Sequence, residues 1–452
     1  MRVVDPDFPF RPERLPFFYG WVVLVVATLA ILVSIPGQTM GVSVFTEPLM
    51  AATGLSRVGL SNAYLCGTLL AGSLLPWAGT FLDRVGARVA ILAGAGGLSI
   101  TLFYLSVVDH AAAAVSELLG GGAEQWSSFV MLVLGFFALR FTGQGMLTLI
   151  GRTLIGRWFD RLRGVVSGAS SPFVSLGFSL APLLFAGWID ASGWRGAWIE
   201  MGLCIGLGMG LVGWFLLRDS PEECGLRMDG AKPDFRAAAS EEVLDAESAG
   251  LQDLEPAYDR ARAIRTLMFW AIVVPLTLQG LTVTGITFHI LDLGAEAGLA
   301  RAVTIGIFPA MAVVSVMASL LVGWLTNHVR LQILFAAMLL AQAGGFVAAS
   351  ALEDPVFYWV AVVGLGFSNG CFVPLSTVSI PHFFGRRHLG AINSTMLMCI
   401  VWGSAIGPSA LAASRDLLGS YQIALLVCAA GSISALLPVL RAPEPPADVQ
   451  IP

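Results

Sequence analysis

The sequence is short of charge. Only 12% of its 452 residues are Asp, Glu, Lys or Arg, whereas soluble globular domains contain about 25%. Apolar residues make up 56% of the chain, and its mean hydropathy is +0.79. Because a helix needs about 20 mostly apolar residues to cross a bilayer, a chain this long and apolar can cross many times. The composition excludes a water-soluble globular protein and predicts a polytopic protein whose environment is the lipid bilayer.

Motifs typical of enzymes and of nucleic-acid-binding proteins are missing too. The six cysteines form no C-x-x-C pair and no cluster with metal-ligand spacing, so we expect them to be buried as small apolar groups. The chain has no Walker sequence, no Ser/His/Asp arrangement in a soluble domain and no basic surface for nucleic acid. We therefore expect neither an enzyme nor an ATP-driven pump, and neither a metal site nor a cofactor.

Long apolar stretches, bounded by charged, polar, Gly or Pro residues, predict twelve membrane-spanning helices. We expect the first stretch to be kept as a span, because no small-residue cleavage site follows it. The predicted fold is all-α, with two pseudo-symmetric bundles of six helices. The spans lie near 19–46, 57–82, 88–108, 127–152, 165–188, 195–217, 265–291, 301–325, 330–350, 355–381, 389–414 and 420–440.

The distribution of positive charge predicts the orientation. If both termini face the cytoplasm, that side carries 20 of the 25 Lys and Arg residues, as the positive-inside rule requires. The expected location is the plasma (inner) membrane. The expected segments are a cytoplasmic tail, a first bundle, an acidic cytoplasmic linker, a second bundle and a second cytoplasmic tail, at 1–18, 19–217, 218–264, 265–440 and 441–452.

The two halves of the chain repeat each other. At a shift of 226 residues, Gly164 pairs with Gly390, Gly177 with Gly403 and Pro182 with Pro408. Parallel repeats of six spans, with the binding site near the midplane between them, are common among secondary transporters.

The turn after the second predicted span contains Gly79, Asp83, Arg84, Gly86 and Arg88. The glycines permit a tight turn, the carboxylate can face the positive N-terminus of a neighbouring helix, and the arginines can anchor at the inner surface. This pattern resembles the signature loop of the major facilitator superfamily, and residues 323–330 resemble a worn copy in the second half. The resemblance implies that these five residues control an inward gate.

Further stretches resemble the bacterial relatives of the monocarboxylate and oxalate:formate transporters within that superfamily. They are residues 18–21, 157–164, 193–195 and 221–226. This resemblance covers the first half and the linker, and it implies a transporter of small organic anions that works as a monomer.

Arg140 is the strongest candidate for binding substrate. It lies near the middle of the fourth span, where an arginine costs roughly 3 kcal/mol, so it should face the bundle interior. Gln144 follows one helical turn later on the same stripe. No acid lies deep in any span, so the guanidinium is free to hold a substrate carboxylate in a bidentate pair. Because the arginine also resembles a motif linked to proton coupling or helix contacts, that role stays open.

Other polar residues within the spans extend the candidate site, although a polar residue of this kind more often makes an interhelical hydrogen bond than a ligand contact. A break at residues 36–38 exposes backbone groups, and His289 is the one midrange titrating group in the spans away from the inner surface. The candidates are Gln38, Asn62, Gln279, His289, Asn369 and Asn393.

One departure from the family leaves the substrate open. Carboxylate-transporting relatives generally carry a basic residue in the eighth span, but residues 302–325 contain no charge. The expected function is therefore secondary active transport of a small organic anion, with a monocarboxylate as the first choice, by proton symport or anion exchange. The alternatives are a transporter of a neutral or amphiphilic solute and, in another class, a membrane sensor that does not transport.

Overall fold

The computed structural model describes residue 5 and residues 7–230 and 258–445, and every regular element in these parts is helical. Most of the predicted acidic linker lies outside the described residues. Ten helical segments are long and apolar enough to cross a membrane, by length and composition. The shorter apolar helix Gly20–Val33 begins the first predicted span.

The first half of the chain forms the helices of one bundle. Its main helices are α1 (Gly20–Val33), α2 (Thr39–Ser43), α3 (Thr46–Thr53), α4 (Arg57–Val85), α5 (Ala87–Ser106), α6 (Val108–Leu118), α7 (Glu124–Leu139), η3 (Arg140–Leu147), α8 (Thr148–Trp158), α9 (Arg163–Leu203), η4 (Cys204–Met209) and α10 (Gly210–Leu216). Short 3-10 turns are η1 (Pro12–Arg14), η2 (Ile35–Gly37), η5 (Glu222–Cys224) and η6 (Met228–Gly230).

The second half forms longer, less interrupted helices. They are α12 (Arg260–Ala263), α13 (Leu267–Glu296), α14 (Arg301–Leu325), α15 (Leu331–Ala349), α16 (Pro355–Phe384), α17 (Leu389–Leu418) and α18 (Gln422–Arg441).

Three predicted spans have a different shape in the structure. The first, predicted as one stretch over 19–46, divides into α1, η2, α2 and α3, because Pro36 lacks the N–H that would continue the helix. The fifth and sixth spans run on through α9, whose helical geometry is broken at Gly193 with φ 70° and ψ 164°. Such a left-handed φ favours glycine.

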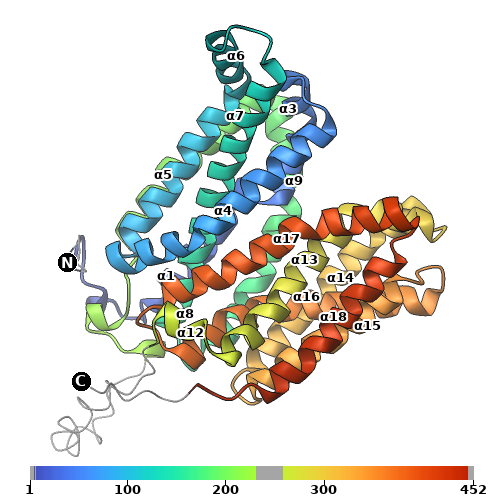
Figure 1. Cartoon of the computed structure of the whole chain (residues 1–452). Coiled ribbons are helices and arrows are strands. Elements are labelled where there is room, and N and C mark those ends of the chain that lie inside the picture. The colour runs from blue at the N-terminus through green and yellow to red at the C-terminus, as the bar shows by residue number, and fades with distance from the viewer. Residues whose placement is uncertain (1–4, 6, 231–257, 446–452) are drawn as a thin grey trace, which may run out of the picture.

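The bundles meet at one end and spread apart at the other. Figure 1 shows the first bundle, blue to green, and the second, yellow to red, joining near α8 and α12 and diverging toward α6 in the first bundle. Between the bundles, α4 packs against α17 and α9 packs against α14. We call the end where the bundles join the basic end, because most of the loop arginines lie there. We call the other end the opposite end.

Glycines permit the close approach of the bundles at the basic end. A Cβ on Gly79 would lie 2.1 Å from the carbonyl oxygen of Gly390, and a Cβ on Gly164 would lie 2.3 Å from that of Gly323. Gly164 and Gly390 are a pair in the sequence repeat, so the two contacts are related by the same internal symmetry.

The cysteines are not uniformly buried. Cys66 and Cys204 are exposed on their helices, whereas Cys224 and Cys371 are buried. The prediction that all six are buried is wrong for these two exposed cysteines, because an apolar group in a membrane protein can face lipid instead of protein. At Cys224, burial is the main cause that raises the pKa of the thiol to about 11, so this cysteine is protonated and unreactive near neutral pH.

The predicted orientation is testable with two introduced cysteines in a background whose native cysteines are replaced. Ala113 is exposed in α6 at the opposite end, and Arg227 is exposed beside the linker at the basic end. We expect Ala113→Cys to react with an impermeant thiol reagent on intact cells. Arg227→Cys should react only after the cells are opened, since the positive-inside rule places it in the cytoplasm. Labelling in the reverse order would overturn the orientation.

Candidate functional site

A cavity of about 400 Å³ lies between the two bundles, within the size range of small-molecule sites. The cavity lies beyond the glycine contacts, toward the opposite end. It is lined by residues 60–68 of α4 and 404–409 of α17, whereas the contact between the same two helices at the basic end is made by Gly79 and Gly390. The lining residues are Thr39, Val42, Ser43, Thr46, Glu47, Leu60, Ser61, Asn62, Tyr64, Leu65, Thr68, Phe136, Arg140, Thr284, Ser404, Ala405, Pro408 and Ser409.

Arg140 is the buried charge of this cavity, with 2% of its surface exposed. Its Nη1 donates a hydrogen bond to the carbonyl oxygen of Gly37 at 3.1 Å, and its guanidinium lies over the Tyr64 ring, 5.3 Å from the centroid. No carboxylate in the described chain forms an ion pair with it, and its buried Nε has no hydrogen-bond partner. Its donors are therefore only partly satisfied.

Local backbone breaks position this arginine. Arg140 begins η3, a π-helical segment, and such wide turns are frequent at functional sites. The break after α1 brings Gly37 against η3, where a Cβ on Gly37 would lie 2.6 Å from the carbonyl oxygen of Leu139. Only glycine fits so close an approach, and it places the Gly37 carbonyl within reach of the guanidinium.

Tyr64, Thr39 and Glu47 are among the cavity residues that were not predicted from the sequence. The hydroxyl groups of Tyr64 and Thr39 lie 2.9 Å apart, so they join α4 to α2 beside Arg140. Glu47 also lines the cavity from α3 and is exposed. Tyr64 lies two residues after Asn62. It was not predicted as a binding residue because a tyrosine within an apolar span is not distinguished from the aromatic residues that pack there. Glu47 was hidden because the first span was expected to continue to residue 46.

Of the predicted binding residues, the structure brings only Arg140 and Asn62 into the lining of this cavity. Gln144 lies in η3 beside Gly37, and its side-chain oxygen is buried without a hydrogen-bond partner. Gln38 donates to the Ser34 hydroxyl at 3.1 Å. These two glutamines therefore line the junction between the broken first span and η3.

The four predicted residues of the second bundle are dispersed. Gln279 is buried and accepts a 2.6 Å hydrogen bond from Ser368. Asn369 donates to the Ser315 hydroxyl on α14, Asn393 donates across to Thr153 on α8, and His289 contacts the carbonyl oxygen of Pro408 and the hydroxyl of Tyr421. The cavity wall at Pro408 thus brings His289 next to the site without placing it in the lining.

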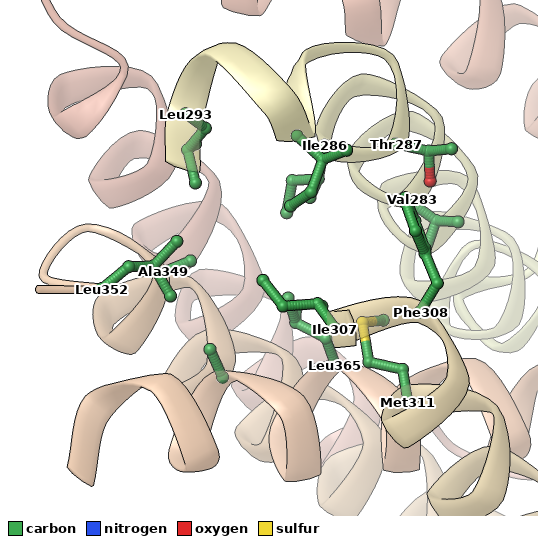
Figure 2. Close-up of a pocket in the computed structure, with 12 residues that line it drawn as sticks. Val283, Ile286, Thr287, Leu293, Ile307, Phe308, Met311, Ala349, Leu352 and Leu365 are labelled. Atoms are coloured by element: carbon green, nitrogen blue, oxygen red, sulfur yellow. The ribbon is translucent and has the colours of Figure 1, made fainter. Parts of the chain in front are cut away.

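A second, apolar cavity lies inside the second bundle, between α13, α14, α15 and α16 (Figure 2). Figure 2 shows Ile286, Ile307 and Leu365 pointing into it, and Thr287 is its one polar lining residue. Its volume of about 30 Å³ has room for one water molecule. It is a packing void and not a substrate site.

Asp83 joins the two bundles at the basic end. Its carboxylate accepts hydrogen bonds from the backbone N–H groups of Gly390, at 3.0 Å, and Ala391, at 2.8 Å, in the first turn of α17. Arg157 of its own bundle pairs with the same carboxylate at 2.6 Å. The carboxylate therefore lies at the positive end of a helix dipole and links the two bundles at the basic end.

The copy of this motif in the second half makes a weaker version of the contact. Asn327 donates from its amide nitrogen to the carbonyl oxygen of Arg161 at 2.6 Å. Asn327 carries no charge, so the mirrored contact lacks the attraction between a carboxylate and a helix N-terminus.

The remaining predicted gating residues act inside the first bundle. Gly86 lies between α4 and α5 with φ 84°, and Arg84 is exposed. Arg88 is buried and donates to the backbone carbonyls of Leu217, at 2.9 Å, of Asp5, at 2.8 Å, and of Phe8. In the structure Arg88 holds the N-terminal tail against the bundle, whereas Asp83 makes the contact between bundles.

A second arginine, Arg152, lies between the bundles below the cavity. Its Nη1 is 3.3 Å from the Ser376 hydroxyl of α16, and its guanidinium lies over the Phe372 ring. Arg152 is the last residue of the predicted fourth span, 127–152. Within the described parts of the chain, no group of three or more His, Cys, Asp or Glu side chains is placed to hold a metal ion.

Residues 26–408 match the family model of the Major Facilitator Superfamily. The chain belongs to this superfamily. A curated relative, the oxalate:formate antiporter of Oxalobacter formigenes, is 22% identical over 191 residues, which are 41% of this chain and 40% of that protein. The matched segment is thus well under two thirds of the relative's length.

Solved structures of superfamily members share the fold. The Escherichia coli fucose:proton symporter FucP aligns with a TM-score of 0.63 at 12% identity, over 94% of this chain and all of that one. The human organic anion transporter TETRAN aligns with a TM-score of 0.62 at 15% identity, again over 94% and 100%. The proton:xylose symporter XylE has a TM-score of 0.64 at 15% identity, over 95% and 97%. The predicted all-α fold of two six-helix bundles is confirmed, and the chain is a multi-pass membrane transporter.

The contact of Asp83 with α17 predicts a gating role. Asp83→Asn keeps one acceptor oxygen but loses the charge that faces Arg157 and the helix N-terminus, so the closed basic end should be destabilised. We expect slower uptake of labelled formate or lactate into proteoliposomes, with equilibrium binding of the same probe unchanged within about threefold, since no substrate contact is removed.

The control is Asp160→Asn, which removes an exposed acid at the same end that pairs with Arg163 of its own bundle. Asp160→Asn should leave both the rate of uptake and the equilibrium binding of the probe as in the parent. Complete loss of binding by folded Asp83→Asn protein would contradict the gating role.

Proposed function

We propose that this transporter moves a small organic anion, with a monocarboxylate as the leading substrate class, by secondary active transport. The two bundles rock about the central cavity, which opens alternately to either side of the membrane. The driving force is proton symport or anion exchange. The five gating positions and the division into two six-helix bundles with a linker between them belong to the same proposal.

The observation that carries the proposal is the incompletely satisfied guanidinium of Arg140. Burying an arginine in a span costs roughly 3 kcal/mol, and one backbone carbonyl with one aromatic face offsets only part of this cost. A substrate carboxylate can accept from the remaining donors in a charge-assisted pair. Asn62, Thr39 and the Tyr64 hydroxyl lie in the same cavity and offer hydrogen bonds to the rest of a small polar molecule.

Two of the related proteins support an anion as substrate. One is named an oxalate:formate antiporter, and another, which shares the fold, is named an organic anion transporter. Both similarities are distant in sequence, so they support the class of substrate and not its identity.

The geometry also supports alternating access. The basic end is closed by Asp83 and the two glycine contacts, while the cavity lies toward the opposite end, where Ser61 and Asn62 are exposed. The proposed setting is a monomer in the plasma (inner) membrane with both termini in the cytoplasm. The observed state then faces outward.

One alternative has an observation in its favour. Apolar side chains from α4, α7 and α17 line part of the cavity, namely Leu60, Leu65, Phe136, Ala405 and Pro408, and α14 has no charged residue between 302 and 325. These features would suit a neutral or amphiphilic solute, for which Arg140 would serve as a structural contact to Gly37.

Substitution of Arg140 separates the two functions. Losing a charge-assisted pair of roughly 1.5 to 3 kcal/mol lowers affinity about tenfold to hundredfold. Arg140→Lys keeps the charge without the bidentate fork, so it should bind labelled monocarboxylates weakly. Arg140→Gln should bind none measurably, and it should express at least as well as the parent because a buried charge is gone.

Arg330→Gln is the matched control, because it removes an exposed arginine at the start of α15, away from the cavity. Its carboxylate affinity should equal that of the parent. If Arg140→Gln binds a carboxylate as tightly as the parent does, the organic-anion proposal fails and the neutral-solute alternative is favoured.

A further inference from the structure

Arg152 lies on the same continuous helix as Arg140 but nearer the basic end. It is in α8, twelve residues after Arg140, so the two Cα atoms are roughly 18 Å apart at the rise of a helix. Since Arg140 lies near the middle of its span and the hydrocarbon core is about 30 Å thick, Arg152 lies close to the inner boundary of that core. Any solute that passes from the cavity to the basic end between the bundles has to pass this level.

The guanidinium of Arg152 points to the second bundle and has no acidic partner. Its Nη1 donates to the Ser376 hydroxyl of α16 at 3.3 Å, and its central carbon lies 5.1 Å from the centroid of the Phe372 ring. No carboxylate of the residues that the structure describes pairs with it. A guanidinium has five N–H donors, so a single hydrogen bond to a neutral hydroxyl leaves most of them for another acceptor.

Two other arginines at the basic end are paired with acids. Arg157 of α8 pairs with Asp83 at 2.6 Å, and Arg386 pairs with Glu222 at 3.1 Å. These pairs give both arginines a structural explanation that Arg152 lacks.

The fold itself does not require a charge at this position. At the shift of 226 residues that relates the two halves, Arg152 corresponds to Val378, which is an apolar residue of α16. The two six-helix bundles can therefore form with an uncharged side chain at this level, and the arginine needs an explanation specific to the first half.

The face of α8 that carries Arg152 is part of the contact between the bundles. Next to it, Thr153 accepts a 3.4 Å hydrogen bond from the amide of Asn393 on α17. Asn393 is 5% exposed, and its Oδ1 is buried without a hydrogen-bond partner. A Cβ on Gly156 would lie 3.0 Å from the side chain of Leu389. The bundles have to separate along this face for the cavity to open toward the basic end, so Arg152 would then line the opening.

We propose that Arg152 is a second anion-binding site, which the substrate carboxylate occupies when the cavity is open toward the basic end. In the observed state Ser376 and Phe372 cover the guanidinium. When α16 moves away, both contacts are lost, and a carboxylate replaces them in a charge-assisted bidentate pair. This rests on the proposed function and deepens it, because the same anion binds at Arg140 and then at Arg152. An anion that binds only the open form also stabilises that form.

The two sides of the membrane should respond differently to loss of this charge. Counterflow of ¹⁴C-labelled formate and lactate is measured in right-side-out and in inverted membrane vesicles. Arg152→Gln should raise the half-saturation concentration on the side of the basic end about tenfold, because a charge-assisted pair is lost. The value on the opposite side should stay within about threefold. Arg152→Lys should lie between Arg152→Gln and the parent, and Arg387→Gln, which removes an exposed arginine at the same end, should match the parent.

Ser376→Ala distinguishes a binding site from a contact that only joins the bundles. It removes the hydroxyl that accepts from Arg152 in the observed state but leaves the arginine in place. For a binding site, the half-saturation concentration on both sides should stay within about threefold of the parent. The proposal is overturned if Ser376→Ala reproduces the effect of Arg152→Gln, or if Arg152→Gln changes both sides equally or neither.

A thiol reaction tests the anion site without any substrate. In a background whose native cysteines are replaced, Ser376→Cys places a thiol beside the guanidinium. Two methanethiosulfonate reagents, one with a sulfonate and one with a trimethylammonium group, are applied to inverted vesicles. The ratio of the two rates cancels the reactivity of the thiol itself, and it should favour the sulfonate at least fivefold less when Arg152→Gln is added. At Arg227→Cys, an exposed position at the same end, Arg152→Gln should leave the ratio unchanged.

The outcomes separate this site from the proposed function. If the parent carries neither formate nor lactate by counterflow, the monocarboxylate proposal fails, and the ratio of thiol rates still decides whether Arg152 attracts anions. A ratio at Ser376→Cys that does not depend on Arg152, or a thiol there that never reacts while Arg227→Cys does, overturns the second anion site.

Discussion

A charge inside a membrane has to find its partners within the protein, and this constraint organises the molecule. Water is absent from the hydrocarbon region, so a guanidinium, carboxylate or imidazole there is tolerated only where backbone groups or other charges meet it. Asp83 is met by an arginine and two helix N-terminal N–H groups. Arg140 is met only in part. The fully satisfied charge lies at the closed end of the molecule, and the partly satisfied one lies in the cavity.

The closed end depends on shape as much as on charge. Gly79 against Gly390 and Gly164 against Gly323 bring the backbones of the two bundles into contact, and this is why the Asp83 carboxylate can reach the first turn of α17. A side chain at any of these four positions would push the helices apart and lengthen the carboxylate contact. Small residues and a single charge therefore act together to hold the two bundles in contact at the basic end.

Pro408 of α17 lines the cavity and also contacts His289 of α13. Proline removes one backbone N–H from α17, and the Pro408 carbonyl accepts from His289. The helix that makes this contact also carries the Asp83 contact at its N-terminal end. α17 therefore joins the wall of the cavity to the contact between the bundles at the basic end.

The sequence by itself determined the all-α membrane fold and the internal repeat, and it predicted the gate motif and the candidate binding role of Arg140. These follow from local properties: length of apolar runs, glycine and proline positions, and the cost of one charge among apolar neighbours. Only the tertiary structure decided which polar residues share a site. Asn62 and Tyr64 reach Arg140 whereas Gln279 and Asn369 do not, and Tyr421 and Asp292 gather around His289. These groupings depend on how helices far apart in sequence rotate and break against one another, as at Gly37, and no pattern within a single span records that rotation.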